Sequence, residues 1–368
     1  MRTRIAPLLI CLCACRHANA APAIRNPALP SDPSAWRWEQ VGKDVYAMIA
    51  PEGVTPIVSG NAVVIVGDDG VLVVDTTQFP STARVLVDHI EHVTDKPVRF
   101  VVDTHWHPDH WTGNGEVLAA WPGAIVIATP NTREMAATKA QPFMSAKYTT
   151  DTIDAITKML ADGKNPRGIA LTPFERAYLA LGIEQMKSYG AELAAATIAP
   201  PTVTFDRELT IHLGAREVDV RFLGRGNTGG DAVVYVPDAK VIATGDLIVA
   251  PYPYAIGSFL GEWVDTLRAL EQIDATTIVP GHGPVLHDHT YIDTEIALVE
   301  SVRSQVGAAV AAKKTLDQAK DALDVAKFRK DLCGDDPWRQ FGFDHVFVAP
   351  AVGRAYREAT EGVLHDET

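Results

Sequence analysis

Residues 103–110 read D-T-H-W-H-P-D-H and hold four potential metal ligands in the order H-x-H-x-D-H. They follow an apolar, β-prone run at 98–102, so a buried strand should end just before them. His105 and His107 are two residues apart, so at a strand end they would project the same way and bind one cation. Pro108 would stop the strand and turn Asp109 and His110 towards a second cation. Imidazole and carboxylate ligands favour zinc, with iron or manganese as alternatives. Four such side chains within six positions make unrelated surface polarity a poor explanation.

The first twenty residues are predicted to be a secretory signal. Two arginines precede an apolar run at 5–15 that is too short to span a bilayer. Ala18-Asn19-Ala20 then fits an A-x-A cleavage site, so we expect cleavage after Ala20 and a periplasmic or secreted protein. The segment ending at Cys15 also resembles a lipoprotein box, and lipidation of Cys15 is the less favoured alternative.

The composition indicates a globular protein with an acidic surface. Hydrophobic residues make up 47% of the 368 residues, which is enough for a sizeable core. Three of the four cysteines lie in the predicted signal, so Cys333 alone remains and no intramolecular disulfide is expected. The formal charge is −13, or −16 without the three arginines of the signal. Such a surface repels phosphate backbones and anionic lipids, so we expect a small-molecule substrate, no nucleic acid and no membrane span.

Strand-like and helix-like segments alternate as in an α/β fold. Residues 21–37 are rich in Pro, Ala, Ser and Asn and are predicted to be a linker. Strands are predicted at 45–49, 62–66, 71–74, 98–102, 124–128, 202–205, 209–213, 218–223, 232–236, 240–243 and 277–279. Residues 131–199 show helical spacing and are predicted to be a helical insertion over the site mouth, either as a moving lid or as static packing. Residues 291–368 are predicted to be a helical C-terminal extension, whose aromatic part packs as a terminal cap or forms a contact in a homo-oligomer.

Asp75 allows two interpretations. It lies between the strand predicted at 71–74 and a helix predicted at about 82–93, so Asp75-Thr76-Thr77 can cap that helix. Its carboxylate can instead support a metal ligand from behind. Capping is the commoner role for an aspartate in this position.

Four motifs occur in an order that indicates a family. After H-W-H-P-D-H come G-R-G-N-T-G-G-D at 224–231, T-G-D at 244–246 and P-G-H-G at 280–283. In these motifs the chain resembles the metallo-β-lactamase-fold hydrolase superfamily. The resemblance implies an α/β fold, an αββα sandwich of two mixed β-sheets flanked by helices, over residues 38–290. It is weakly specific for substrate, because the family includes β-lactamases, glyoxalase II-type thioesterases, sulfatases, lactonases and phosphodiesterases.

The resemblance also implies ligands for two ions. Site one would take His105 and His107, site two would take Asp109, His110 and His282, and Asp246 would bridge both ions. Asn227 stands where the family usually has the third site-one histidine. An amide oxygen is a weaker donor to zinc than imidazole. Either Asn227 coordinates through its oxygen, or site one binds loosely or stays empty, or an oxygen-preferring metal takes it. Asp231 could stand in, but it more often shapes such a turn.

The expected reaction is hydrolysis by metal-bound hydroxide. A cation lowers the pKa of bound water to about 7, and Asp109 would orient this nucleophile as the catalytic residue. Arg225 can hold a substrate carboxylate or form a surface ion pair, and Tyr252 and Tyr254 can line the pocket or serve as packing. We therefore expect an exported metallo-hydrolase with one or two zinc ions, acting on a small ester, thioester, lactone or β-lactam. The alternative is a weakly active or non-catalytic metal-binding partner protein of a periplasmic system.

Overall fold

The computed structural model describes residues 32–194 and 196–367. The signal predicted at 1–20 and most of the linker predicted at 21–37 lie outside the described residues. Across the two described ranges, none of the helices combines the length and the apolar character that a bilayer span requires.

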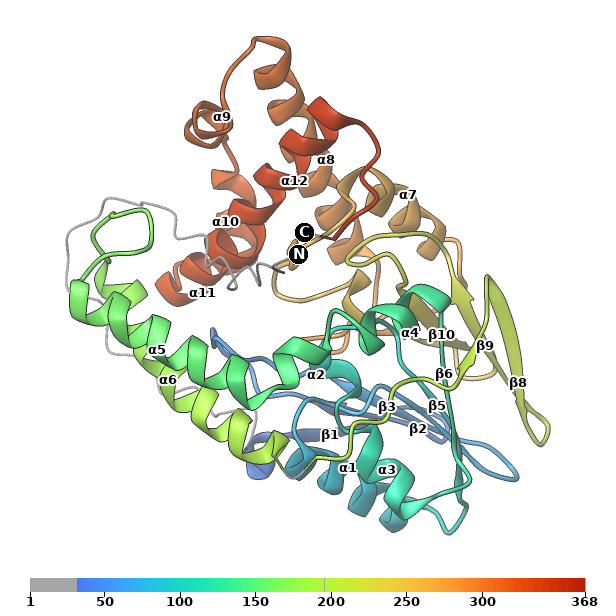
Figure 1. The fold of residues 1–368 in the computed structure, drawn as a ribbon. Helices are drawn as coiled ribbons and strands as arrows, with labels where there is room; N and C mark the ends of the chain where they lie inside the picture. Colours follow the sequence, from blue (N-terminus) through green and yellow to red (C-terminus); the bar gives the residue numbers. More distant parts are fainter. Residues whose placement is uncertain (1–31, 195, 368) are drawn as a thin grey trace.

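Seven strands form the first sheet, in the order in which they follow one another along the chain (Figure 1). The first four strands are antiparallel, and each of the last three runs parallel to the strand before it. They are β1 (Arg37–Gly42), β2 (Val45–Ile49), β3 (Ala62–Val66), β4 (Val71–Val74), β5 (Val98–Val102), β6 (Ile125–Ala128) and β7 (Val203–Thr204). The Val- and Ile-rich runs of β3 and β4 are buried on both faces, as expected for a sheet that is covered on both sides.

Five strands form the second sheet, in the order β12-β11-β10-β9-β8. β11 and β12 are parallel, and the other neighbours are antiparallel. The strands are β8 (Glu208–Leu213), β9 (Arg216–Phe222), β10 (Ala232–Val236), β11 (Val241–Ala243) and β12 (Thr277–Val279). Because it contains both parallel and antiparallel pairs, this sheet is mixed, like the first.

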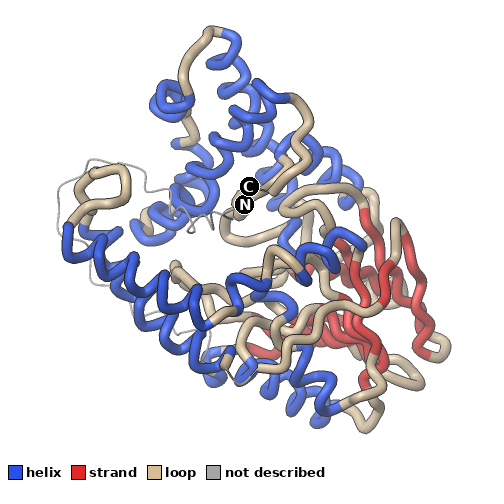
Figure 2. The backbone as a smooth tube through the Cα atoms, in the orientation of Figure 1, coloured by secondary structure: helices blue, strands red, loops and turns tan. Residues whose placement is uncertain are grey.

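The two sheets pack face to face, and helices cover both outer faces (Figure 2), which confirms the predicted αββα sandwich. Between the sheets, Val63 and Val74 of the first share a buried core with Val220 and Val234 of the second. On the outer face of the first sheet, Val64 and Val73 belong to a core with Leu86 and Ile90 of α1 (Pro80–Val93). α3 (Asn114–Ala120) contributes Val117 to the same core.

The segment between β6 and β7 is helical, as predicted for 131–199. It contains α4 (Pro130–Ala137), the 3-10 turn η2 (Gln141–Met144), α5 (Ala146–Asp162) and α6 (Pro173–Leu193). α6 begins at Pro173, because Thr172 and Glu175 form a capping box. Thr172 Oγ1 accepts from the Glu175 amide over 3.2 Å, and Glu175 Oε2 accepts from the Thr172 amide over 2.6 Å. α5 and α6 lie side by side as a hairpin (Figure 1). The two predicted roles of this insertion, a moving lid and static packing, both stay predictions.

The C-terminal helices and α7 (Leu260–Leu270) cover the outer face of the second sheet. These helices are α8 (Thr290–Ala311), α9 (Leu316–Ala322), α10 (Ala326–Cys333), α11 (Pro337–Gly342), the π-helical η4 (Phe343–Val348) and α12 (Ala349–Glu361). Phe343 and Phe347 are fully buried there, so this part of the aromatic segment packs within the chain. A homo-oligomer stays a prediction.

Three local predictions differ from the structure. β1 was not predicted, because Arg37–Gly42 carries a single β-branched residue and its first residue was assigned to the linker. Asp75 does not cap α1, whose N-cap is Phe79. His105 and His107 do not lie at the end of a strand, because β5 ends at Val102 and both histidines belong to the following loop.

Candidate metal centre

The predicted ligands lie on loops that follow the carboxyl ends of strands from both sheets. The loop after β5 carries His105 and His107 and continues into the one-turn helix α2 (Pro108–Trp111), which carries Asp109 and His110. In the second sheet, Asp246 lies on the turn η3 (Gly245–Leu247) after β11, and His282 follows β12. Because β11 and β12 are parallel neighbours, their ends deliver both side chains to the same edge.

One group of potential ligand atoms comes from His105, His110 and Asp246, all buried. Nε2 of His110 lies 3.2 Å from Oδ1 of Asp246, and Nε2 of His105 lies 3.8 Å from Oδ2. His107 joins this group through His105, since its Nδ1 lies 3.0 Å from His105 Nε2. Both oxygens of Asp246 thus face imidazoles.

A second group comes from Asp109, His110 and His282. Nε2 of His282 lies 3.1 Å from Oδ2 of Asp109 and 3.4 Å from Oδ1 of Asp246. Nε2 of His110 lies 3.4 Å from Asp109 Oδ2 and 3.4 Å from His282 Nε2. His110 and Asp246 therefore stand between the two groups, and the predicted ligands other than Asn227 form one continuous cluster.

The charge balance of this cluster suits a cation. Oδ1 of Asp246 is buried with no hydrogen-bond partner among the described residues, although two imidazole nitrogens are close to it. Burial lowers the pKa of His105 well below its usual value, which leaves it neutral and able to act as a ligand. Burial acts in the same direction on His110, but Asp246, Asp109 and Asp75 outweigh it and hold the pKa of His110 well above its usual value. A divalent cation can replace such a proton, so imidazole and carboxylate donors here fit zinc, iron or manganese.

Asp75 supports His110 from behind. Its Oδ2 lies 2.7 Å from His110 Nδ1, and its two oxygens also accept from the amide and the hydroxyl of Thr104 over 2.8 Å. Burial raises the pKa of Asp75, and the neighbouring His110 offsets part of that rise. An aspartate behind a histidine fixes which ring nitrogen faces the metal. The supporting interpretation of Asp75 therefore holds, in place of capping.

Asn227 is buried, and the nitrogen and oxygen of its side-chain amide have different surroundings. Nδ2 donates to the carbonyl of Tyr254 over 2.9 Å, whereas Oδ1 has no hydrogen-bond partner among the described residues. A buried acceptor without a partner costs roughly 1–3 kcal/mol unless something else satisfies it. Asp231 shapes the same turn, because its carboxylate accepts from the Gly226 and Thr228 amides over 3.1 and 2.8 Å. Coordination by Asn227 stays a prediction, for which the free oxygen is the supporting feature.

Residues other than the predicted ligands fix the spacing of these ligands. A Cβ on Gly281 would lie 2.0 Å from Asp246 Oδ1, and a Cβ on Gly60 would lie 2.4 Å from the His110 ring. Asn61 donates from Nδ2 to the carbonyls of Pro280 and Gly283 over 2.8 and 3.0 Å, which ties the His282 turn to the start of β3. Gly60 and Asn61 stand in no motif, so no sequence signal marks them.

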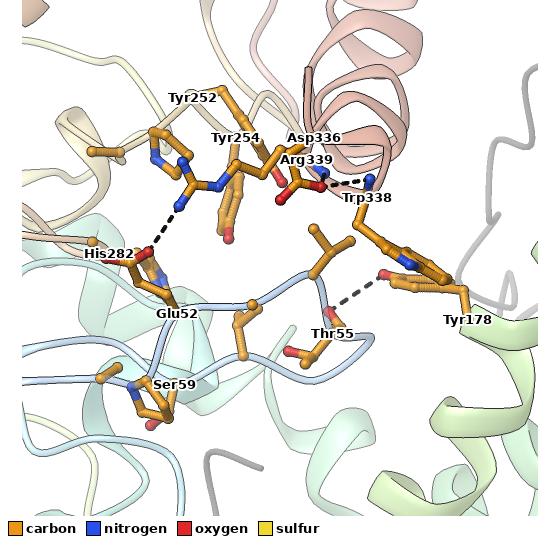
Figure 3. Close-up of a pocket in the computed structure, with 18 of the residues that line it drawn as sticks. Glu52, Thr55, Ser59, Tyr178, Tyr252, Tyr254, His282, Asp336, Trp338 and Arg339 are labelled. Carbon is orange, nitrogen blue, oxygen red and sulfur yellow. Dashed lines mark hydrogen bonds and ion pairs between the residues drawn. The ribbon is translucent and has the colours of Figure 1, made fainter. Parts of the chain in front are cut away.

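A cavity of about 540 Å³ opens beside His282 (Figure 3). Tyr252 and Tyr254 line it, as predicted, and the Tyr254 ring lies 5.2 Å from the His282 ring. Val58, Tyr178 and Leu181 add an apolar wall. At the mouth, Nη2 of Arg339 lies 3.0 Å from Oε2 of Glu52. The insertion and the C-terminal extension therefore both contribute to this cavity.

Arg225 has its guanidinium engaged within the protein. Nε donates to Glu262 over 2.8 Å, Nη2 contacts the same carboxylate, and Nη1 donates to the carbonyl of Leu364 over 3.0 Å. The guanidinium also stacks over the Phe259 ring at 4.1 Å. Arg225 is absent from the lining of the cavity beside His282. Of its two predicted roles, the ion pair is the one these contacts support.

Comparison with known proteins gives a consistent assignment. The family model described as the metallo-beta-lactamase superfamily matches residues 55–282. The chain is 24% identical over 223 residues to a linear primary-alkylsulfatase from Pseudomonas sp., which covers 58% of this chain and 40% of that protein. It is also 24% identical over 192 residues to an (R)-specific secondary-alkylsulfatase from Pseudomonas sp., which covers 50% of this chain and 27% of that protein. The chain thus spans less than half the length of these relatives.

Solved structures share the fold. A metallo-beta-lactamase from Pontibacter korlensis has a TM-score of 0.51 and 20% identity, and the match covers 72% of this chain and 99% of that one. A stereoselective inverting sec-alkylsulfatase from Pseudomonas sp. has a TM-score of 0.58 and 17% identity, and the match covers 87% of this chain and 50% of that one. At these identities the likeness concerns the fold alone.

Proposed function

Because this chain belongs to the metallo-beta-lactamase superfamily, we propose that it is a metal-dependent hydrolase of small esters that carry an apolar chain. The observation that carries this proposal is the position of His282. It is a member of the buried ligand cluster and also part of the wall of the 540 Å³ cavity. A substrate in that cavity would present its reacting bond at the metal centre.

Zinc is the preferred cofactor, with one or two ions, and iron or manganese are the alternatives. The ligands would be His105, His107, Asp109, His110, Asn227, Asp246 and His282. A bound divalent cation would supply the acidity that brings the pKa of water to about 7 and would polarise the substrate oxygen.

The chain's own residues would orient the reactants. Asp109 would accept a hydrogen bond from the attacking water, because its carboxylate lies beside the predicted ligand histidines, with Oδ2 3.1 Å from Nε2 of His282. Burial raises the pKa of Tyr254, so its phenol stays protonated and can donate a hydrogen bond to the substrate. The cavity walls exclude water from the rest of the substrate.

The lining of the cavity supports the proposed substrate class. Val58, Tyr178 and Leu181 offer apolar surface for a chain, and the polar end of the substrate faces His282. The two relatives are named as a primary-alkylsulfatase and a secondary-alkylsulfatase, which makes alkyl sulfates the first candidate substrates. Carboxylic esters, thioesters and lactones with an apolar group come next, and β-lactams last, because the apolar walls suit a chain.

The alternative is a weakly active or non-catalytic metal-binding protein, and Asn227 is the observation behind it. If its oxygen binds metal poorly, site one stays empty. The test is elemental analysis of the purified protein, followed by hydrolysis assays with alkyl sulfates and acyl esters before and after metal removal. His110→Ala should abolish turnover, and His212→Ala, at an exposed position on β8, should not. Metal bound without turnover on any of these substrates, in the wild type and in Asn227→His, would favour the alternative.

A further inference from the structure

The segment after α12 returns to the metal centre. Oε1 of Glu367 accepts a hydrogen bond from the Gly229 amide over 2.9 Å, and Oε2 accepts one from the indole Nε1 of Trp106. Trp106 stands between His105 and His107, and Gly229 stands two residues after Asn227. One carboxylate therefore joins two loops that carry three of the predicted ligands.

This segment is held in place by arginines. Arg225 donates to the Leu364 carbonyl over 3.0 Å, and Arg354 donates to the Asp366 carbonyl over 2.9 Å. Leu364 is buried, and Gly257 approaches so closely that a Cβ there would lie 2.7 Å from the Glu367 carbonyl. The backbone that carries Glu367 is thus anchored before its side chain reaches the two loops.

The two partners of Glu367 are themselves rigid. Trp106 is 7% exposed and packs with Trp111 and Ala136, while its ring lies 4.6 Å from the His107 ring. A Cβ on Gly229 would lie 2.8 Å from Glu367 Oε1, so the loop fits closely around this carboxylate.

We propose that Glu367 is a positioning residue of the metal centre: its carboxylate fixes the loop of His105 and His107 against the loop of Asn227. Its contribution would fall on the site-one ion, whose third ligand would be the amide oxygen of Asn227. With a weak donor in that place, affinity depends more on how well the loops are held. The inference rests on the proposed function for its metal centre, but metal binding can test it without turnover.

The test compares Glu367→Gln with Asp366→Asn in the full chain. The glutamine has the shape of the glutamate, but it can accept only one of the two hydrogen bonds and carries no charge. Asp366 is the matched control, because it lies in the same segment and its carboxylate faces Arg357 over 3.0 Å and Arg354 over 3.5 Å. An asparagine there keeps the backbone carbonyl to which Arg354 donates. Each apoprotein is titrated with zinc and with cobalt(II), whose visible absorption reports ligand geometry.

We expect Glu367→Gln to raise the dissociation constant of the weaker-binding ion at least tenfold and to change its cobalt spectrum. Asp366→Asn should stay within twofold of wild type with an unchanged spectrum. Trp106→Phe removes the indole donor, so combining it with Glu367→Gln should give less than the product of the two single losses. The inference is overturned if Glu367→Gln, folded by circular dichroism, binds both ions like Asp366→Asn. Absence of turnover in the wild type would contradict the proposed function, whereas the metal titrations would still decide the role of Glu367.

Discussion

Oδ2 of Asp75 lies 2.7 Å from Nδ1 of His110, and both side chains are buried. Asp75 adopts a left-handed backbone conformation, with φ 57, directly after β4. That conformation is uncommon for a residue with a side chain and indicates a position fixed by its surroundings.

Asp75→Asn should weaken metal binding about 10- to 100-fold, in the range measured for residues that support metal ligands. The amide cannot stabilise the charge on His110, and it can present its NH₂ to the ring in place of an acceptor. Metal affinity by competition with a chromogenic chelator measures the change. Asp69→Asn, at an exposed hairpin position that pairs with Arg99, is the control. Equal affinities in the two variants would contradict the role of Asp75.

Gly281→Ala should abolish binding of at least one ion. The added Cβ would lie 2.0 Å from Asp246 Oδ1, which forces this carboxylate out of the cluster. Metal-to-protein stoichiometry by mass spectrometry of the native protein is the measurement. Gly307→Ala is the matched control, because no atom lies within 4 Å of its added Cβ and α8 gains a better helix former. Wild-type stoichiometry in Gly281→Ala would mean that Asp246 binds no metal.

Ala177→Trp should shorten the range of accepted chains. Ala177 lies on α6 and lines the cavity beside His282, so an indole there occupies space that a long substrate chain would need. We expect kcat/KM for the longest accepted chain to fall at least tenfold, while the shortest ester changes less than threefold. Ala180→Trp, on the exposed side of the same helix, should change neither. An equal loss of kcat/KM at all substrate chain lengths would mean that the apolar chain of the substrate binds outside this cavity.

His345 should contribute to acid sensitivity. Burial lowers its pKa to about 4 from the ordinary 6.5, since the ring stacks on Phe341 at 5.6 Å and lies against Tyr178. Between these values the unfolded chain binds more protons, so the free energy of unfolding falls as the pH falls from 6.5 to 4 and is insensitive to His345 above 6.5. The loss from pH 7 to pH 4.5 should be roughly 2 kcal/mol smaller in His345→Gln than in wild type. Urea unfolding measures it, with His212→Gln as the exposed control, and an equal loss in both variants would refute the prediction.

The strands could be predicted closely because apolar residues recur with a clear period and turns interrupt them. β3, β4, β5 and β10 have the predicted bounds. The clustering of the candidate ligands could be predicted because histidines and aspartates recur at short spacings inside motifs. The role predicted for Asp246 depends on the resemblance, since this aspartate alone is compatible with an ordinary turn.

The contributions of Asn61, Gly60 and Glu367 could not be predicted from the sequence, because each depends on contacts between distant segments. Glu367 meets Trp106 across 261 positions, and no local pattern marks either residue for the other. Of the two interpretations of Asp75, the sequence favours capping for a similar reason. Capping is a local effect, whereas the His110 contact needs the loop after β5 to fold back over the end of β4. Ligation by Asn227, the N-terminal signal and the substrate roles of Arg225, Tyr252 and Tyr254 stay predictions.

The cavity beside His282 takes part of its walls from α6 and from Trp338 and Arg339 of α11, and neither helix carries a predicted metal ligand. In the proposed function, substrate selectivity and reactivity at the metal would therefore depend on different segments of the chain. Substitutions in the insertion or in the C-terminal helices could then change which substrates bind without any change in the loops that carry the histidines and aspartates.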